Sequence, residues 1–112
     1  MASKSKISKV SVARFAPGQI VKHKQFGYKG LIFDVDAVFS QPPEWYEVMA
    51  KARPAKDAPW YHMLVDGETH TTYVAEGNLV EIEGADNIDH PLLELLFDHG
   101  RNGCFESRLV MN

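Results

Sequence analysis

Five histidines are the side chains of this sequence best suited to bind a metal ion. Three of them fall in stretches of strand-like composition that also hold acidic residues. No two show the His-x-x-x-His or His-x-His spacing that places a pair of imidazoles on one side of a helix or strand. We therefore expect no metal site and no cofactor, and we predict that the histidines are partly buried and hydrogen-bonded. The five are His23, His62, His70, His90 and His99.

Residue types used in covalent or acid–base catalysis do not form a recognisable motif. The single cysteine, Cys104, has no neighbours that would activate its thiolate, and no Gly-x-Ser-x-Gly segment is present. The segment from Gly27 to Gly30 lacks the Gly-Lys-Ser/Thr ending of a phosphate-binding loop. Asp34 and Asp36 are two residues apart without a matched acid or base, so we place both on the solvent-facing side of a strand. We expect a non-enzymatic protein without catalytic residues.

Aromatic and basic residues are interleaved in a pattern that suits nucleic acid binding. The aromatic rings can stack on bases, while the basic side chains can contact phosphates. The alternative for each ring is packing in the core, which a small domain also needs. Tyr28 is the exception because it falls in a predicted turn, where burial is less obligatory. The aromatic residues are Tyr28, Trp60, Tyr61 and Tyr73, and the basic ones are Lys22, His23, Lys24 and Lys29.

The charge is divided unevenly along the chain. Seven of the 12 Lys and Arg residues and none of the 15 Asp and Glu residues lie between Met1 and Phe33. A basic amino-terminal part is compatible with an anionic partner such as nucleic acid. The alternative is a solvated tail followed by a strand edge.

Length and composition indicate one domain. A chain of 112 residues of which 45% are hydrophobic suits a single core. No run approaches the roughly 18 to 20 apolar residues that cross a bilayer, and residues 1–6 lack the apolar stretch of a secretory signal. A lone cysteine fits a reducing compartment. We expect a cytoplasmic protein with a flexible basic leader at 1–14, a folded domain at 15–100 and a tail at 101–112 with no readable pattern.

Short apolar runs separated by turn residues predict strands. Glycines at 27 and 30 suit a tight reversal between two of them, and Asp66-Gly67 suits a second hairpin. In the second run, alternation predicts a core face with Leu31, Phe33 and Val35, and an opposite face with Ile32, Asp34 and Asp36. The expected strands are 19–23, 30–37, 60–65, 70–74 and 79–83, with a turn at 76–79.

Two helices are expected beside these strands. Residues 44–53 place Trp45, Val48, Met49 and Ala52 at helical spacing, and Pro54 would end that helix. A second helix is predicted from about Asp89, its N-cap, to Gly100, its C-cap. Its leucine-rich run must pack on the sheet, on another subunit or on a partner. The expected fold is mainly β: a small SH3-like curled barrel of about five strands with one inserted helix and a C-terminal helix.

Four segments of the chain together resemble a known domain. In order, they look like motifs of the YccV-like, or HspQ, hemimethylated-DNA-binding domain, and the likeness covers about residues 15–98. Four motifs in the right order are far more specific than a single hairpin. The segments are GQIVKH at 18–23, FGYKGLI at 26–32, PWYHMLV at 59–65 and YVAEGNL at 73–79.

The resemblance implies a function as well as a fold. It implies an SH3-like β-barrel, binding to DNA methylated on one strand, and, in bacteria, a small heat-shock protein that acts as a specificity factor in Lon-dependent turnover of DnaA and denatured proteins. The motif positions of the family fall on Lys22, His23, Gly27, Tyr28, Gly30, Trp60, Tyr61, His62, Tyr73 and Glu76. Lys24 and Lys29 are added to these positions as further candidate binding residues.

Two functional hypotheses therefore stand. The first is a non-enzymatic, stress-linked binding protein that contacts Lon protease, DnaA and also DNA. The alternative is a dedicated DNA-binding protein that reads hemimethylated duplex sites. Whether the protein forms a homo-oligomer is open.

Overall fold

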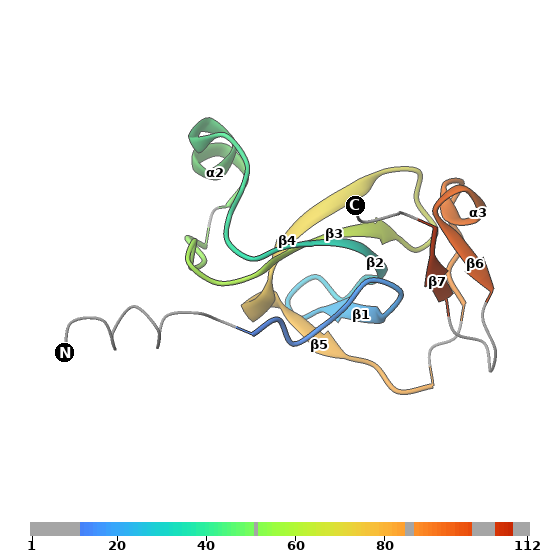
Figure 1. Cartoon of the computed structure of the whole chain (residues 1–112). Helices are drawn as coiled ribbons and strands as arrows, with labels where there is room; N and C mark the ends of the chain where they lie inside the picture. Colours follow the sequence, from blue (N-terminus) through green and yellow to red (C-terminus); the bar gives the residue numbers. More distant parts are fainter. Residues whose placement is uncertain (1–11, 51, 85–86, 100–104, 109–112) are drawn as a thin grey trace.

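The computed structural model describes residues 12–50, 52–84, 87–99 and 105–108 (Figure 1). Most of the predicted leader and of the tail, with Cys104 and Gly100, lies outside this part. A five-stranded antiparallel sheet has the order β4-β3-β2-β1-β5, and a two-stranded sheet pairs β6 with β7. The strands are β1 (Ile20–His23), β2 (Lys29–Asp36), β3 (Trp60–Val65), β4 (Thr71–Ala75), β5 (Leu79–Glu81), β6 (Phe97–His99) and β7 (Phe105–Ser107). The helices are α2 (Pro43–Met49), α3 (Leu93–Leu96) and the 3₁₀ turn η1 (Glu76–Asn78).

The predicted hairpins are confirmed. In the turn between β1 and β2, Gly27 has φ 79°, a left-handed conformation that favours glycine. Gly30 opens β2 and is buried, and a Cβ there would collide with Met63 Cε and lie 3.2 Å from the Leu64 carbonyl oxygen. The second reversal uses Gly67, also at φ 79°. Backbone conformation thus favours glycine at Gly27 and Gly67, and close packing favours it at Gly30.

The sheet is strongly curled, although it is not closed into a barrel. The edge strands of a flat five-stranded sheet would lie about 19 Å apart. Here β4 and β5 are joined by the three residues of η1, which span about 6 Å, so their ends must come together. Within the described residues these two edges do not pair with each other. The mainly β prediction is confirmed, while the closed barrel is not observed.

Both faces of the sheet are buried, which overturns the face assignment made from alternation. A β-bulge between Ile32 and Asp34 shifts the register of β2. As a result, Val35 packs with fully buried Ile32 in one cluster, whereas Phe33 packs with Leu31 in another. A bulge adds one residue to a strand, so every later side chain changes face. The expectation that Ile32 faces solvent is wrong.

The inserted helix is shorter than predicted and rotated. α2 ends at Met49, five residues before Pro54. Its buried contacts come from Tyr46 and from Ala50, which caps the helix, while Val48 and Met49 are exposed. Of the predicted apolar stripe only Trp45 packs against the sheet cluster, and the stripe is wrong for Val48, Met49 and Ala52, because helical spacing also fits the buried pair at 46 and 50.

The predicted C-terminal helix is reduced to a single turn. α3 covers only Leu93–Leu96, and the chain continues directly into β6, which pairs with β7. Asp89 does not cap the helix, whose N-cap is Leu92 with no side-chain cap bond; the Asp89 backbone N–H donates to Asp66 Oδ1 at 2.7 Å. An unbroken apolar run suits a strand as well as a helix, and periodicity alone does not separate them.

The leucine-rich run packs on the sheet, as one of the predicted alternatives states. Leu92, Leu93 and Leu96 pack against the cluster formed by Ile20, Leu31, Leu64, Ile88, Phe97 and Phe105. Leu95 is 71% exposed. The hairpin of β6 and β7 therefore covers one face of the main sheet. Among the residues described, no helix is both long and apolar enough to cross a membrane.

Candidate functional site

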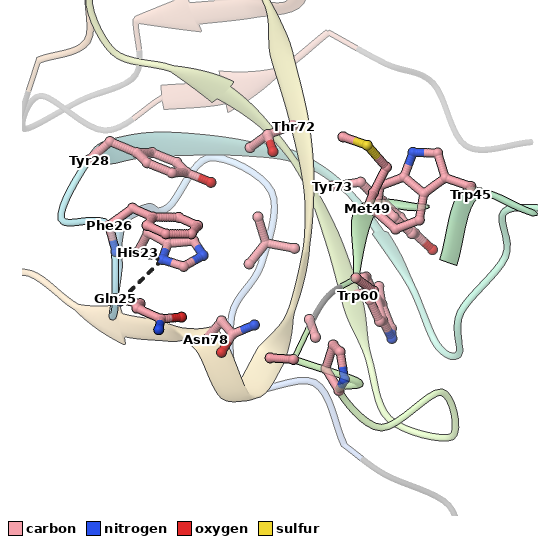
Figure 2. Close-up of a pocket in the computed structure, with 15 residues that line it drawn as sticks. His23, Gln25, Phe26, Tyr28, Trp45, Met49, Trp60, Thr72, Tyr73 and Asn78 are labelled. Atoms are coloured by element: carbon pink, nitrogen blue, oxygen red, sulfur yellow. Dashed lines mark hydrogen bonds between the residues drawn. The ribbon is translucent and has the colours of Figure 1, made fainter. Parts of the chain in front are cut away.

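A pocket of about 520 Å³ opens between the β1–β2 turn and α2, along the edge strand β4 (Figure 2). Its volume lies within the range of about 300 to 1,000 Å³ that is typical of small-ligand sites. Two groups of aromatic rings line it, one on each face of β4, whose ribbon runs between them. The lining residues are His23, Gln25, Phe26, Tyr28, Trp45, Met49, Ala50, Ala52, Pro54, Trp60, Thr72, Tyr73, Val74, Ala75 and Asn78.

The first wall is a stack built by the β1–β2 turn. His23 lies 4.6 Å from Phe26, ring centroid to centroid, at an interplanar angle of 20°, and 5.1 Å from Tyr28. His23 Nδ1 accepts the backbone N–H groups of Gln25 at 3.1 Å and Phe26 at 3.0 Å, which fixes the turn. Phe26 is nevertheless 74% exposed. The turn therefore holds an aromatic ring out into solvent at the rim of the pocket.

The second wall comes from β3, β4 and α2. Trp60 and Tyr73 stack at 5.1 Å and 24°, and Trp45 meets Tyr73 edge-on at 5.4 Å and 82°. The Trp60 indole N–H donates to the Ala55 carbonyl at 2.9 Å, and the Tyr73 hydroxyl donates to Asp36 Oδ2 at 2.7 Å. Burial, together with this bond to Asp36, raises the pKa of Tyr73 to about 12. These bonds fix two rings of the wall.

The pocket lining is aromatic and polar but uncharged. None of the described lining residues is Asp, Glu, Lys or Arg. Polar groups are supplied by His23, Gln25, Asn78 and Thr72, and the Tyr28 hydroxyl bonds Thr72 where the two sides of the pocket meet. Burial is the main cause that raises the pKa of Tyr28. A phosphate would find no cation inside this pocket, whereas an uncharged planar group would find stacking surfaces.

Cations lie outside the lining, on both sides of the pocket. Lys24 follows His23 in the chain, is exposed, and its backbone N–H donates to the Asn78 carbonyl at 2.7 Å. On the α2 side, the Lys56 ammonium lies 4.2 Å from the Tyr46 ring centroid. These two lysines flank the uncharged pocket.

The structure brings together only part of the predicted site. His23, Tyr28, Trp60 and Tyr73 all line the pocket. Lys22 and Lys29 do not, because they pair directly across β1 and β2 and so share the opposite face of the sheet from His23. Lys29 Nζ also lies 3.6 Å from Asp66 Oδ2. The expected single face of lysines and aromatic rings is therefore divided between two faces.

Tyr61 and Glu76 form a buried support rather than part of the pocket surface. Tyr61 is fully buried; its hydroxyl donates to Glu76 Oε1 at 2.5 Å and accepts the Phe15 N–H at 3.2 Å. Burial, followed by the bond to Glu76, raises the pKa of Tyr61 to about 12. Glu76 also accepts the Arg14 N–H at 2.9 Å. This network ties the chain before β1 to β3 and η1.

The histidine prediction is largely confirmed. His62 Nε2 lies 3.0 Å from Asp36 Oδ2, and His90 Nε2 lies 2.8 Å from the His70 carbonyl oxygen. The His70 side chain is exposed, contrary to the prediction, and the His99 side chain lies outside the described set. Potential ligand atoms of Asp34, Asp36 and His62 lie within 4.8 Å of one another. Since Asp36 Oδ2 already faces two hydrogen-bond partners, the absence of a metal site stays our prediction.

Eleven of the fifteen lining residues were not predicted as site residues, among them Trp45, Met49, Asn78 and Phe26. Trp45 and Met49 were assigned to a buried stripe, and Asn78 to a turn. Phe26 had a readable signal, because an aromatic residue between two strands and next to a turn glycine lies at a loop tip. The other three reach the pocket only because α2 and η1 fold back beside β4.

A curled antiparallel sheet that carries an aromatic, uncharged pocket defines a small β-sheet binding module. A family model described as hemimethylated DNA-binding protein YccV like matches residues 13–103 of the 112-residue chain. The chain belongs to this YccV-like family, and the resemblance drawn from its four motifs is confirmed.

Proposed function

We propose that this protein is a non-enzymatic binding protein that recognises DNA methylated on one strand through its aromatic pocket. The family description supports DNA as the ligand. The observation that carries the proposal is the pocket itself: aromatic rings beside an uncharged lining suit a nucleobase, which is planar and neutral and can stack on one of them. The phosphates adjoining that base would remain outside the pocket.

The lysines on either side of the pocket complete this proposal. Lys24 and Lys56 are exposed and lie beside opposite walls. Each lysine that neutralises a phosphate releases a counterion and adds about 0.9 to the salt slope. The protein has a net charge of −3, so its affinity must depend on a few well-placed cations.

Titration of a fluorescent duplex tests the proposal. Hemimethylated, fully methylated and unmethylated duplexes would be compared between about 50 and 200 mM salt, the range in which phosphate contacts change affinity most visibly. We expect the hemimethylated duplex to bind best. Lys24→Glu with Lys56→Glu should weaken binding strongly, whereas the matched pair Lys22→Glu with Lys29→Glu, neither of which lines the pocket, should not. Absence of hemimethylated duplex binding by the wild-type protein at 50 mM salt would refute the proposal.

A second candidate function is a stress-linked adaptor that acts as a specificity factor in the turnover of DnaA and denatured proteins by Lon protease. Phe26, exposed beside an uncharged pocket, favours it, since apolar side chains of a protein partner would fit there equally well. We place this adaptor in the cytoplasm. Pull-down of purified Lon or DnaA by this protein, with nuclease added, separates the two candidate functions. An adaptor retains its partner without DNA, and Phe26→Ala should release it.

A further inference from the structure

The imidazole of His23 is held in one tautomer. Its Nδ1 accepts two backbone N–H groups, from Gln25 at 3.1 Å and from Phe26 at 3.0 Å. A ring nitrogen that accepts hydrogen bonds carries no proton, so in the neutral ring the proton is on Nε2. Burial favours this neutral form, since it lowers the pKa of His23. The ring therefore offers one N–H donor, at Nε2.

That donor has no partner within the described part of the protein. His23 is only 5% exposed, and its hydrogen bonds there all use Nδ1. Among the described residues, every fully buried side-chain nitrogen or oxygen has a hydrogen-bond partner. Nε2 has none, so it is not fully buried, and the open space beside His23 is the pocket that this residue lines. Figure 2 shows the second ring nitrogen on the side away from the bond to Gln25. A ligand in the pocket would meet this donor.

We infer that His23 Nε2–H donates to an acceptor on a methylated base that has swung out of the duplex into the pocket. This inference rests on the proposed function. A base inside a duplex exposes only its edges, so the rings beside His23, those of Phe26 and Tyr28, can contact its face only after extrusion. Extruded bases are read by stacking and by hydrogen bonds to ring nitrogens and carbonyl oxygens. Val74, which lines the pocket on the same face of β4 as Tyr28, provides apolar surface for the methyl group.

Two substitutions separate the donor from the turn. His23→Asn keeps an acceptor near the position of Nδ1, because asparagine side chains accept backbone N–H groups in turns, but it removes the donor at Nε2. His23→Gln places an amide N–H near the position of Nε2 instead. We expect His23→Asn to weaken hemimethylated duplex binding by about 5- to 10-fold, the loss of one hydrogen bond, and His23→Gln to recover part of it.

Base extrusion is measured directly with 2-aminopurine placed beside the methylated base. Its fluorescence should rise when the wild-type protein binds and should rise less with His23→Asn. Binding without any rise would overturn this inference while leaving the proposed function intact. No binding at all would overturn the proposed function, and this inference with it.

Nuclear magnetic resonance of the wild-type protein keeps the test valid if either variant fails to fold. In the free protein, ¹⁵N shifts should identify the Nε2–H tautomer, and addition of the hemimethylated duplex should move the Nε2–H resonance. A resonance that moves only with an apolar peptide, and not with the duplex, would assign the pocket to a protein partner and refute the inference.

Discussion

The most informative substitution is Phe26→Ala, because Phe26 is 74% exposed yet forms the rim of the pocket. Stacking of one base on one aromatic ring contributes about 1 to 3 kcal/mol. Loss of the ring should therefore raise the Kd for the hemimethylated duplex by about 5- to 150-fold. Folding should be little affected. The substitution removes the stack on His23, which contributes about 0.5 to 1.5 kcal/mol, but leaves both backbone bonds to Nδ1 in place.

Fluorescence anisotropy with a labelled duplex gives the Kd, and urea denaturation gives the free energy of unfolding of the same samples. Leu95→Ala is the matched control, since Leu95 is 71% exposed but lies on α3, away from the pocket lining. We expect the control to leave the Kd unchanged. A Kd for Phe26→Ala equal to that of the wild-type protein would refute the assignment of the pocket as the binding site.

Four further predictions concern stability and its dependence on pH. Gly30→Val should lower the free energy of unfolding by about 1 to 3 kcal/mol, because its side chain would collide with Met63; an unchanged melting temperature would contradict this. Tyr61→Phe should lower the free energy of unfolding, measured by urea denaturation, by about 1.5 to 3 kcal/mol, because the hydrogen bond to the Glu76 carboxylate is lost. A decrease below about 0.5 kcal/mol would show that this bond contributes little. Leu96→Glu should destabilise the protein through partial burial of a charge, unlike Leu95→Glu at an exposed site, and similar melting curves for the two would refute the packing of α3. Because burial lowers the pKa of His23 below its ordinary value of 6.5, the unfolded chain binds this proton more readily, so stability should fall as pH drops below 6.5. Denaturation at a series of pH values should show that His23→Asn removes this part of the pH dependence.

The sequence by itself determined the strands and the turns between them. Both hairpins lie where glycines and short apolar runs place them, and the 3₁₀ turn follows β4 as predicted. These features depend on neighbours in the chain, because the left-handed φ of Gly27 and of Gly67 is set by the local turn and favours glycine. Family membership was also readable, because four motifs in order are a property of the chain alone.

Only the tertiary structure decided which residues share a face and which share the pocket. The bulge in β2 moved Asp34 and Val35 to faces that alternation did not predict, and it depends on pairing with β3. The register between β1 and β2 placed Lys22 directly opposite Lys29.

The pocket itself joins a turn, an edge strand and α2, which are far apart in the sequence. Likewise, the single donor of His23 follows from two backbone N–H groups that the folded turn directs at Nδ1. Composition and spacing indicate which side chains could form a binding site. Their orientation depends on long-range packing and register, which local sequence does not encode.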